Sequence, residues 1–299
     1  IIQTGEVLGT ISAALGSLST NTFTGARTVD VSTGVYVESA VSPVIDTAGY
    51  LLTIRKDPGA TSVVELNGNG GALASGLSLN GTANSRFLVT GLTFRDYTYG
   101  IDISSTPAAV TLSSNTYVNN TYGVYVAAAG PLLISSNTII PPTGKNSFGI
   151  YLEALTLGVT VQYNQVLFSS ATVGSLTYRG IYLTNNVHRY LLRNNIINSP
   201  SAQNNPSVYG IYVSGSPSGI IKLNSVNIYT GAAASYAVYI AAASPYSTGT
   251  VITSNIFSGN YGAYYGIYYG AATQQTGTYS DYNDIYGFRY IGYWGPDNY

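Results

Sequence analysis

Charged and sulfur-containing residues are the two classes that this 299-residue sequence has least of. Lys, Arg, Asp and Glu make up 8% of the chain, against roughly 25% in an average soluble domain. The net charge of −1 gives no reason to expect a nucleic acid as partner. The absence of Cys excludes disulfides and thiolate chemistry, and Met is absent as well.

Long apolar runs are also missing. No stretch approaches the ~20 apolar residues of a membrane-spanning helix, so we expect no membrane span. The chain begins at Ile1 rather than Met, and we therefore expect a module or a processed subunit of a longer product. Tyr dominates what is present, with 29 copies against seven Phe and one Trp. A Tyr ring packs while its hydroxyl stays in water. This neutral, Tyr-rich composition is typical of an exported protein and predicts an extracellular or cell-surface location.

A short phrase recurs along the chain. Its type form is Tyr-Gly-Ile-Tyr-Val at 209–213, and the copies lie about 23 to 31 residues apart. Self-similarity at a period of 20–50 residues indicates stacked repeats that share one core. The second position of the phrase falls at Gly100, Gly123, Gly149, Gly180, Gly210, Ala237 and Gly266.

Short apolar strands surround a second recurring position upstream of each phrase. We assign this corner position to Gly91, Asn115, Asn137, Asn164, Asn194, Asn224, Ser254 and Asn283. Long segments of 3.6-residue period and the leucine-rich repeat spacing are both absent. The pattern therefore predicts an all-β, right-handed parallel β-helix of about 9–11 rungs, with two or three strands in each. Stacked Asn side chains would hydrogen-bond up the corner.

The first residues differ from the repeats. Ile11, Leu15 and Leu18 recur at helical spacing and predict a short helix that caps the open end of the stack. We place this cap at 1–27 and the β-helix at 28–299, and treat both as one domain.

These motifs resemble those of a known family. The Asn-x-x-Ile corner followed by Tyr-Gly-Ile-Tyr-Val is similar to the repeat of secreted bacterial right-handed parallel β-helix proteins, the pectate-lyase-like superfold. The helix near Thr10, the segment 31–39 and the endings at 280–286 and 292–295 also resemble family phrases. The resemblance implies the fold but no single activity, because this fold supports many. Lyases of this fold use Asp-lined calcium sites with an Arg or Lys base.

Catalytic groups are scarce where the repeats are most regular. Glu153 is the only acid between Asp102 and Asp281, so paired-carboxylate hydrolysis is difficult to build. A calcium site also needs several oxygen ligands, and His188 is the only His. We therefore favour a non-enzymatic protein and predict no catalytic residue, no metal and no cofactor.

Two sets of residues are candidates for binding. Strand alternation sends the third position of the phrase inward and the fourth outward, and an outward column either stabilises the stack, forms an interface or docks sugar rings. The tyrosine column comprises Tyr125, Tyr151, Tyr182, Tyr212, Tyr239 and Tyr268, with Asp102 before it. The candidate contacts to an acidic glycan, which are otherwise solvated loop residues, are Arg179, His188, Arg189 and Arg193.

The segment between corner and phrase is longest at 168–178 and 198–208. Such insertions are either tolerated surface loops or part of a binding face. We predict an adhesin-like or structural β-helix, a module of a large cell-surface protein or a subunit of an extracellular filament or sheath. Its expected partners are other copies or other cell-surface proteins. The alternative is a carbohydrate-active β-helix, a polysaccharide lyase or a glycan-binding module.

Overall fold

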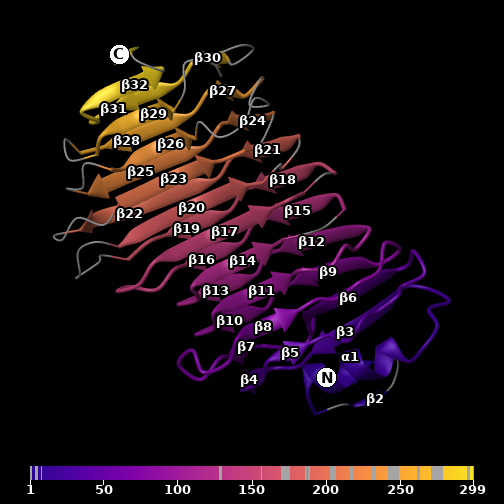
Figure 1. The fold of residues 1–299 in the computed structure, drawn as a ribbon. Coiled ribbons are helices and arrows are strands. Elements are labelled where there is room, and N and C mark those ends of the chain that lie inside the picture. Colours follow the sequence, from indigo (N-terminus) through magenta and orange to yellow (C-terminus); the bar gives the residue numbers. More distant parts are fainter. Residues whose placement is uncertain are drawn as a thin grey trace.

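The computed structural model describes residues 2–3, 6–7, 9–127, 130–155, 157–169, 176–185, 187, 189–202, 207–215, 218–230, 234–241, 249–260, 263–270, 279–294 and 297–298. From β3 onward its strands stack in chain order toward the C-terminus (Figure 1). They form three sheets, so each rung of the described solenoid contributes one strand to each sheet. The predicted all-β parallel β-helix is thereby confirmed.

Sheet A has ten parallel strands and two short antiparallel strands at its N-terminal edge. Its members are β2 (Glu6–Val7), β1 (Ile2–Gln3), β3 (Arg27–Val31), β6 (Leu51–Lys56), β9 (Arg86–Thr90), β12 (Ala109–Ser113), β15 (Leu132–Ser135), β18 (Val159–Gln162), β21 (Tyr190–Arg193), β24 (Gly219–Lys222), β27 (Val251–Thr253) and β30 (Tyr279–Asp281).

Sheet B has ten parallel strands. They are β4 (Gly34–Tyr36), β7 (Val64–Asn67), β10 (Thr93–Arg95), β13 (Thr116–Val118), β16 (Thr138–Ile140), β19 (Gln165–Leu167), β22 (Ile196–Ala202), β25 (Ser225–Thr230), β28 (Ile256–Gly259) and β31 (Asp284–Tyr286).

Sheet C has ten parallel strands and one antiparallel strand, β33, on its last member. They are β5 (Ala40–Val41), β8 (Ser75–Ser78), β11 (Tyr99–Ile103), β14 (Tyr122–Val126), β17 (Ser147–Glu153), β20 (Thr177–Thr184), β23 (Ser207–Val213), β26 (Tyr236–Ile240), β29 (Tyr265–Tyr269), β32 (Tyr290–Trp294) and β33 (Asp297–Asn298).

The predicted capping helix is present as α1 (Ile11–Ser19), and its apolar side chains are buried at the N-terminal end of the stack. Thr10 caps it by accepting a hydrogen bond from the Ala13 backbone N–H at 3.0 Å. The Glu38 carboxylate also accepts hydrogen bonds from the backbone N–H groups of Ile11 and Ser12, at 2.9 and 3.2 Å. A negative charge at a helix N-terminus is stabilising, so Glu38 fixes the cap to the first rung.

The core consists of columns of inward-pointing side chains, in which similar residues lie above one another on successive rungs. The predicted inward residues of the phrase are all buried: Ile101, Val124, Ile150, Ile181, Ile211, Val238 and Ile267. Each rung is too short to bury its apolar face alone, so the rungs stabilise one another by stacking.

A ladder of Asn side chains, buried at every member but the last, occupies the corner between sheets A and B. Each Asn Oδ1 accepts a hydrogen bond from the corner N–H of the preceding rung, at 2.9 to 3.1 Å. Each Nδ2 donates to a backbone carbonyl one rung back, at 2.8 to 3.0 Å. The ladder contains Asn115, Asn137, Asn164, Asn195, Asn224, Asn255 and Asn283.

The predicted corner assignment was wrong at three positions. Gly91, Asn194 and Ser254 each precede the ladder position, which belongs to Leu92, Asn195 and Asn255. The preceding residue carries the left-handed backbone of the corner, with φ between 52° and 74° at Gly91, Ser114, Ser136, Tyr163, Asn194, Leu223, Ser254 and Tyr282. The left-handed conformation therefore falls one residue before the ladder Asn, on several residue types.

Candidate functional site

The outer face of sheet C carries two parallel columns of aromatic side chains, which we call the tyrosine face. The predicted column is present and continues at both ends in one unbroken register: Asp102, Tyr125, Tyr151, Tyr182, Tyr212, Tyr239, Tyr268 and Tyr293. A second column was not predicted and contains Tyr99, Tyr122, Phe148, Arg179, Tyr209, Tyr236, Tyr265 and Tyr290.

The second column exists because alternation fails at the Gly of the phrase. Strict alternation would point Tyr99 inward, yet its ring contacts that of Tyr125 at 5.2 Å between centroids on the outer face. The typical burial pattern places two consecutive inward residues, the Gly and the aliphatic residue after it, between two outward aromatics. The sequence signal for this column was an aromatic residue before the second position of the phrase, in every copy except the one that begins at Arg179.

The second position of the phrase requires Gly because a larger side chain would collide with the next rung. A Cβ at Gly180 would lie 2.5 Å from the Gly210 carbonyl oxygen and 2.9 Å from Ile197 Cγ2 on the next rung. Real Cβ contacts do not come this close to backbone. The Gly column therefore lets the rungs approach closely, and this approach brings the rings into contact.

Aromatic contacts are continuous along the face. In the first column, the ring centroids of neighbours from Tyr125 to Tyr293 are 4.7 to 5.2 Å apart. Such aromatic pairs stabilise the folded state by more than the burial of their apolar surface alone. Burial raises the pKa of the Tyr239 hydroxyl to about 12, and neighbouring phenols add to the effect. The face is thus uncharged at neutral pH except at its few ionised residues.

Arg179 takes the place of an aromatic residue in the middle of the second column. Its guanidinium carbon lies 5.1 Å from the ring centroid of Phe148 and 5.3 to 5.4 Å from those of Tyr182, Tyr209 and Tyr212. Such distances are typical of cation–π contacts. Within the described residues its Nε is buried without a hydrogen-bond acceptor, and no carboxylate pairs with it. Among the residues that the structure describes, Arg179 therefore places a cation without a carboxylate partner among aromatic rings.

Comparison with known proteins identifies the fold family. The family model for the right-handed beta helix region matches residues 62–226, more than half of the chain. This chain belongs to the right-handed β-helix family. Searches of curated proteins and of solved structures each found no match to this β-helix.

The basic residues singled out from the sequence do not form one cluster in this β-helix. Arg179 lies on sheet C, whereas Arg193 is on β21 of sheet A, where its Nε donates to Gln162 Oε1 at 2.7 Å. Arg189 is exposed just before β21. His188 lies outside the described residues, as do 170–175 and 203–206 of the two longest segments.

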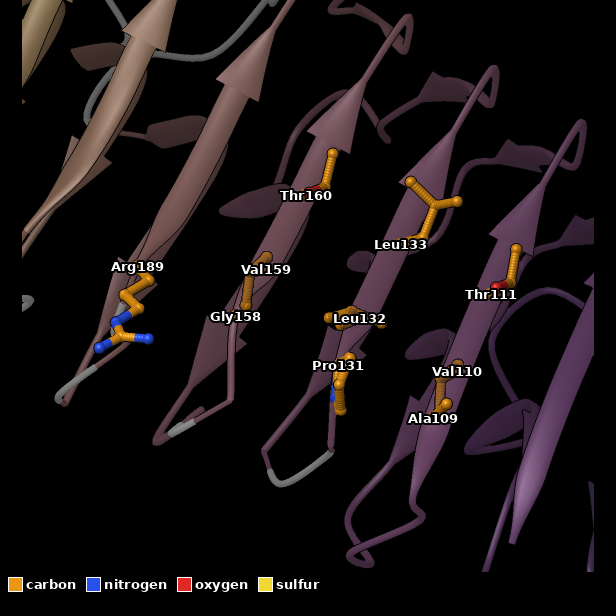
Figure 2. Close-up of a pocket in the computed structure, with 10 residues that line it drawn as sticks. All are labelled: Ala109, Val110, Thr111, Pro131, Leu132, Leu133, Gly158, Val159, Thr160 and Arg189. Carbon is orange, nitrogen blue, oxygen red and sulfur yellow. The ribbon is translucent and has the colours of Figure 1, made fainter. Parts of the chain in front are cut away.

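A shallow hollow of about 460 Å³ lies across β12, β15 and β18 of sheet A. Figure 2 shows Thr111, Leu133 and Thr160 on these strands and Arg189 at the start of the next. A second hollow of about 360 Å³ continues past Arg189 across β21, β24 and β27. No aromatic side chain lines the first hollow, so it lacks the stacking platform that the tyrosine face provides.

The described part of the chain contains neither a cluster of metal-binding side chains nor a helix suited to crossing a membrane. No group of three or more His, Asp or Glu side chains there is placed to hold a metal ion. No helix in that part is both long and apolar enough to cross a membrane.

Proposed function

We propose that this β-helix is a non-enzymatic structural or adhesive protein that binds through its tyrosine face. It would be a module of a large cell-surface protein or a subunit of an extracellular filament or sheath. The observation that carries the proposal is the pair of aromatic columns running over eight consecutive rungs of sheet C. Contiguous apolar patches of this kind on soluble proteins mark interaction sites.

The dimensions of the face support a protein partner. Eight rungs spaced by ~4.8 Å give a height of about 34 Å, and two outward positions three residues apart give a width of about 15 Å with their side chains. Two such faces packed together would bury about 1,000 Å², which is the lower bound for a specific protein–protein interface. Tyr is enriched in such interfaces.

Paired substitutions test this proposal. Replacing Tyr182 and Tyr212 together with Ser should weaken self-association or binding to a surface partner, measured by sedimentation and electron microscopy. Tyr163 and Tyr229 are exposed but lie off the face, so their replacement with Ser is the matched control. A variant that only melts at lower temperature, with unchanged association, would mean that the columns serve stability alone.

Arg179 favours a second candidate function, binding of an acidic polysaccharide. Sugar rings stack on flat aromatic surfaces, and a sugar carboxylate would pair with the Arg179 guanidinium. The substitution Arg179→Gln should then abolish binding to acidic polysaccharides while leaving any binding to neutral ones. Incubation with both kinds of polysaccharide should also be followed for unsaturated products and reducing ends. Turnover would contradict the structural proposal, and ordered polymers without turnover would contradict a lyase.

A further inference from the structure

Tyrosine is almost the only oxidisable side chain in this protein. Cys and Met, which oxidants attack readily in other proteins, are both absent, and 29 Tyr stand beside one Trp. A one-electron oxidant therefore acts mainly on phenols. Thirteen of these phenols are gathered on the tyrosine face, in rings that contact one another from rung to rung.

Tyr182 differs from the other rings of its column. The remaining neighbours in that column are stacked, with interplanar angles of 7° to 26°. Tyr182 instead lies crosswise to both of its neighbours, at 68° to Tyr151 and 72° to Tyr212. This crossing coincides with the break in the second column: the Arg179 guanidinium lies 5.3 Å from the centroid of the Tyr182 ring, at a position that an aromatic residue occupies on the other rungs from Tyr99 to Tyr290.

We propose that Tyr182 is a site of oxidative cross-linking, coupled to Tyr212 on the next rung by a peroxidase acting with hydrogen peroxide. Each phenol loses one electron and one proton to give a phenoxyl radical. The two radicals form a carbon–carbon bond between ring positions ortho to oxygen, and the hydrogen at each coupled carbon moves to the phenolic oxygen. The pair thus loses two hydrogen atoms in total, and one peroxide is reduced to two water molecules.

The crossed geometry favours this pair over its stacked neighbours. Tyr151 and Tyr182 are also crossed but lie farther apart, at 5.0 Å between centroids. Tyr236 and Tyr239 are crossed at 4.8 Å but lie on the same strand, so their coupling would not join two rungs. In the dityrosine product, the two rings lie side by side and are twisted about the new bond, since their ortho substituents prevent both coplanarity and stacking. Tyr182 and Tyr212 already lie at a large angle, with centroids 4.8 Å apart. The stacked pair Tyr239 and Tyr268 is equally close at 4.8 Å but nearly parallel at 7°, so it would have to leave the stack.

Coupling of Tyr182 to Tyr212 would form a covalent cross-link between β20 and β23 near the middle of the tyrosine face. In a chain without Cys, such a bond takes the role of a disulfide, which stabilises mainly by restricting the unfolded chain. Cross-linking would harden an extracellular structural protein after export. This use rests on the proposed structural function, although the coupling chemistry itself does not.

The experiment is peroxidase and hydrogen peroxide treatment of the full chain at low concentration, followed by proteolysis and mass spectrometry. The expected product is a monomeric protein with one cross-linked peptide pair containing Tyr182 and Tyr212, lighter than the two peptides by two hydrogen atoms. Absence of dityrosine would overturn the proposal. Coupling confined to exposed residues off the face, such as the 79% exposed Tyr282, would also overturn it.

Two conservative variants sharpen the test. Tyr182→Phe keeps the ring but has no phenolic O–H, so the cross-linked pair should disappear, while the melting temperature of the untreated protein stays unchanged. Tyr282→Phe should leave the cross-link intact. An undiminished Tyr212 cross-link in Tyr182→Phe would disprove the assignment. Assembly assays on unoxidised protein test the proposed function separately. Cross-linking without assembly would contradict the proposed function, and assembly without cross-linking would contradict the proposed cross-link.

Discussion

The Asn ladder and the tyrosine face are both columns of one residue type, yet they differ in how strictly each position is determined. Every described ladder position from Asn115 to Asn283 is Asn. The face accepts Phe148, Arg179 and Asp102 among its tyrosines. Loss of a buried amide leaves hydrogen-bond donors and acceptors unsatisfied, whereas a partly exposed ring is exchanged for another side chain at lower cost. Stacking of side chains therefore does not require the same residue type on every rung, whereas buried hydrogen bonds between side chains do.

The largest expected loss of stability comes from substitution in the Asn ladder. Asn195→Ala removes the acceptor of the Asn164 N–H and the donor to the Val161 carbonyl. Leaving such buried groups unpaired should lower the free energy of unfolding by about 3 kcal/mol. Denaturant titration measures this loss. The adjacent Asn194→Gly is the control, because Gly adopts φ of 52° without strain. Equal losses in both variants would contradict the corrected register.

A smaller effect is expected at the Gly column beneath the face. Gly180→Ala places a Cβ against the Gly210 carbonyl oxygen, and overpacking of this kind costs about 1–3 kcal/mol. Ala237 occupies the equivalent position on a later rung and is fully buried. The melting temperatures of Gly180→Ala and Ala237→Gly, measured by calorimetry, would show whether a single rung can accommodate the Cβ of Ala at this position. An unchanged melting temperature in Gly180→Ala would mean that the rungs separate easily.

The phenols of the face should make stability sensitive to alkaline pH, in contrast to the ladder, which has no titratable group. Because the pKa of Tyr239 is about 12 in the folded protein and about 10 in the unfolded chain, its contribution is complete below pH 10 and is lost as the pH rises to about 12. Denaturation midpoints across this range should fall, and they should fall less in Tyr239→Phe. Parallel pH profiles for the two proteins would contradict the raised pKa.

The smallest effect concerns the residue before the ladder. Leu223 has φ of 57° and is 52% exposed, a conformation that Asn adopts more readily. Leu223→Asn should therefore stabilise the protein by about 0.5–1 kcal/mol, measured as an upward shift of the denaturation midpoint. No shift would indicate that the corner imposes little strain on Leu.

Much of this fold follows from the sequence alone. The spacing of the phrase, the cap residues Ile11, Leu15 and Leu18, and the inward Ile and Val column were sufficient to predict a capped parallel β-helix. These features depend on periodicity, which is visible in the sequence without knowledge of the contacts between rungs. The first tyrosine column was predicted for the same reason, since it follows from strand alternation. The exported location and the partners remain predictions.

Tertiary structure decided the features that depend on contacts between rungs. The sequence contains Asn194 next to Asn195, and only the hydrogen bonds to Asn164 and Asn224 show which of them is in the ladder. The second aromatic column arises from a break in alternation at Gly. Arg179 was grouped with Arg189 and Arg193 by proximity in sequence, yet it lies among four rings contributed by three rungs. Neighbours across a stack are some 30 residues apart in the chain, so their pairing is determined by register and close packing, which local sequence patterns do not specify.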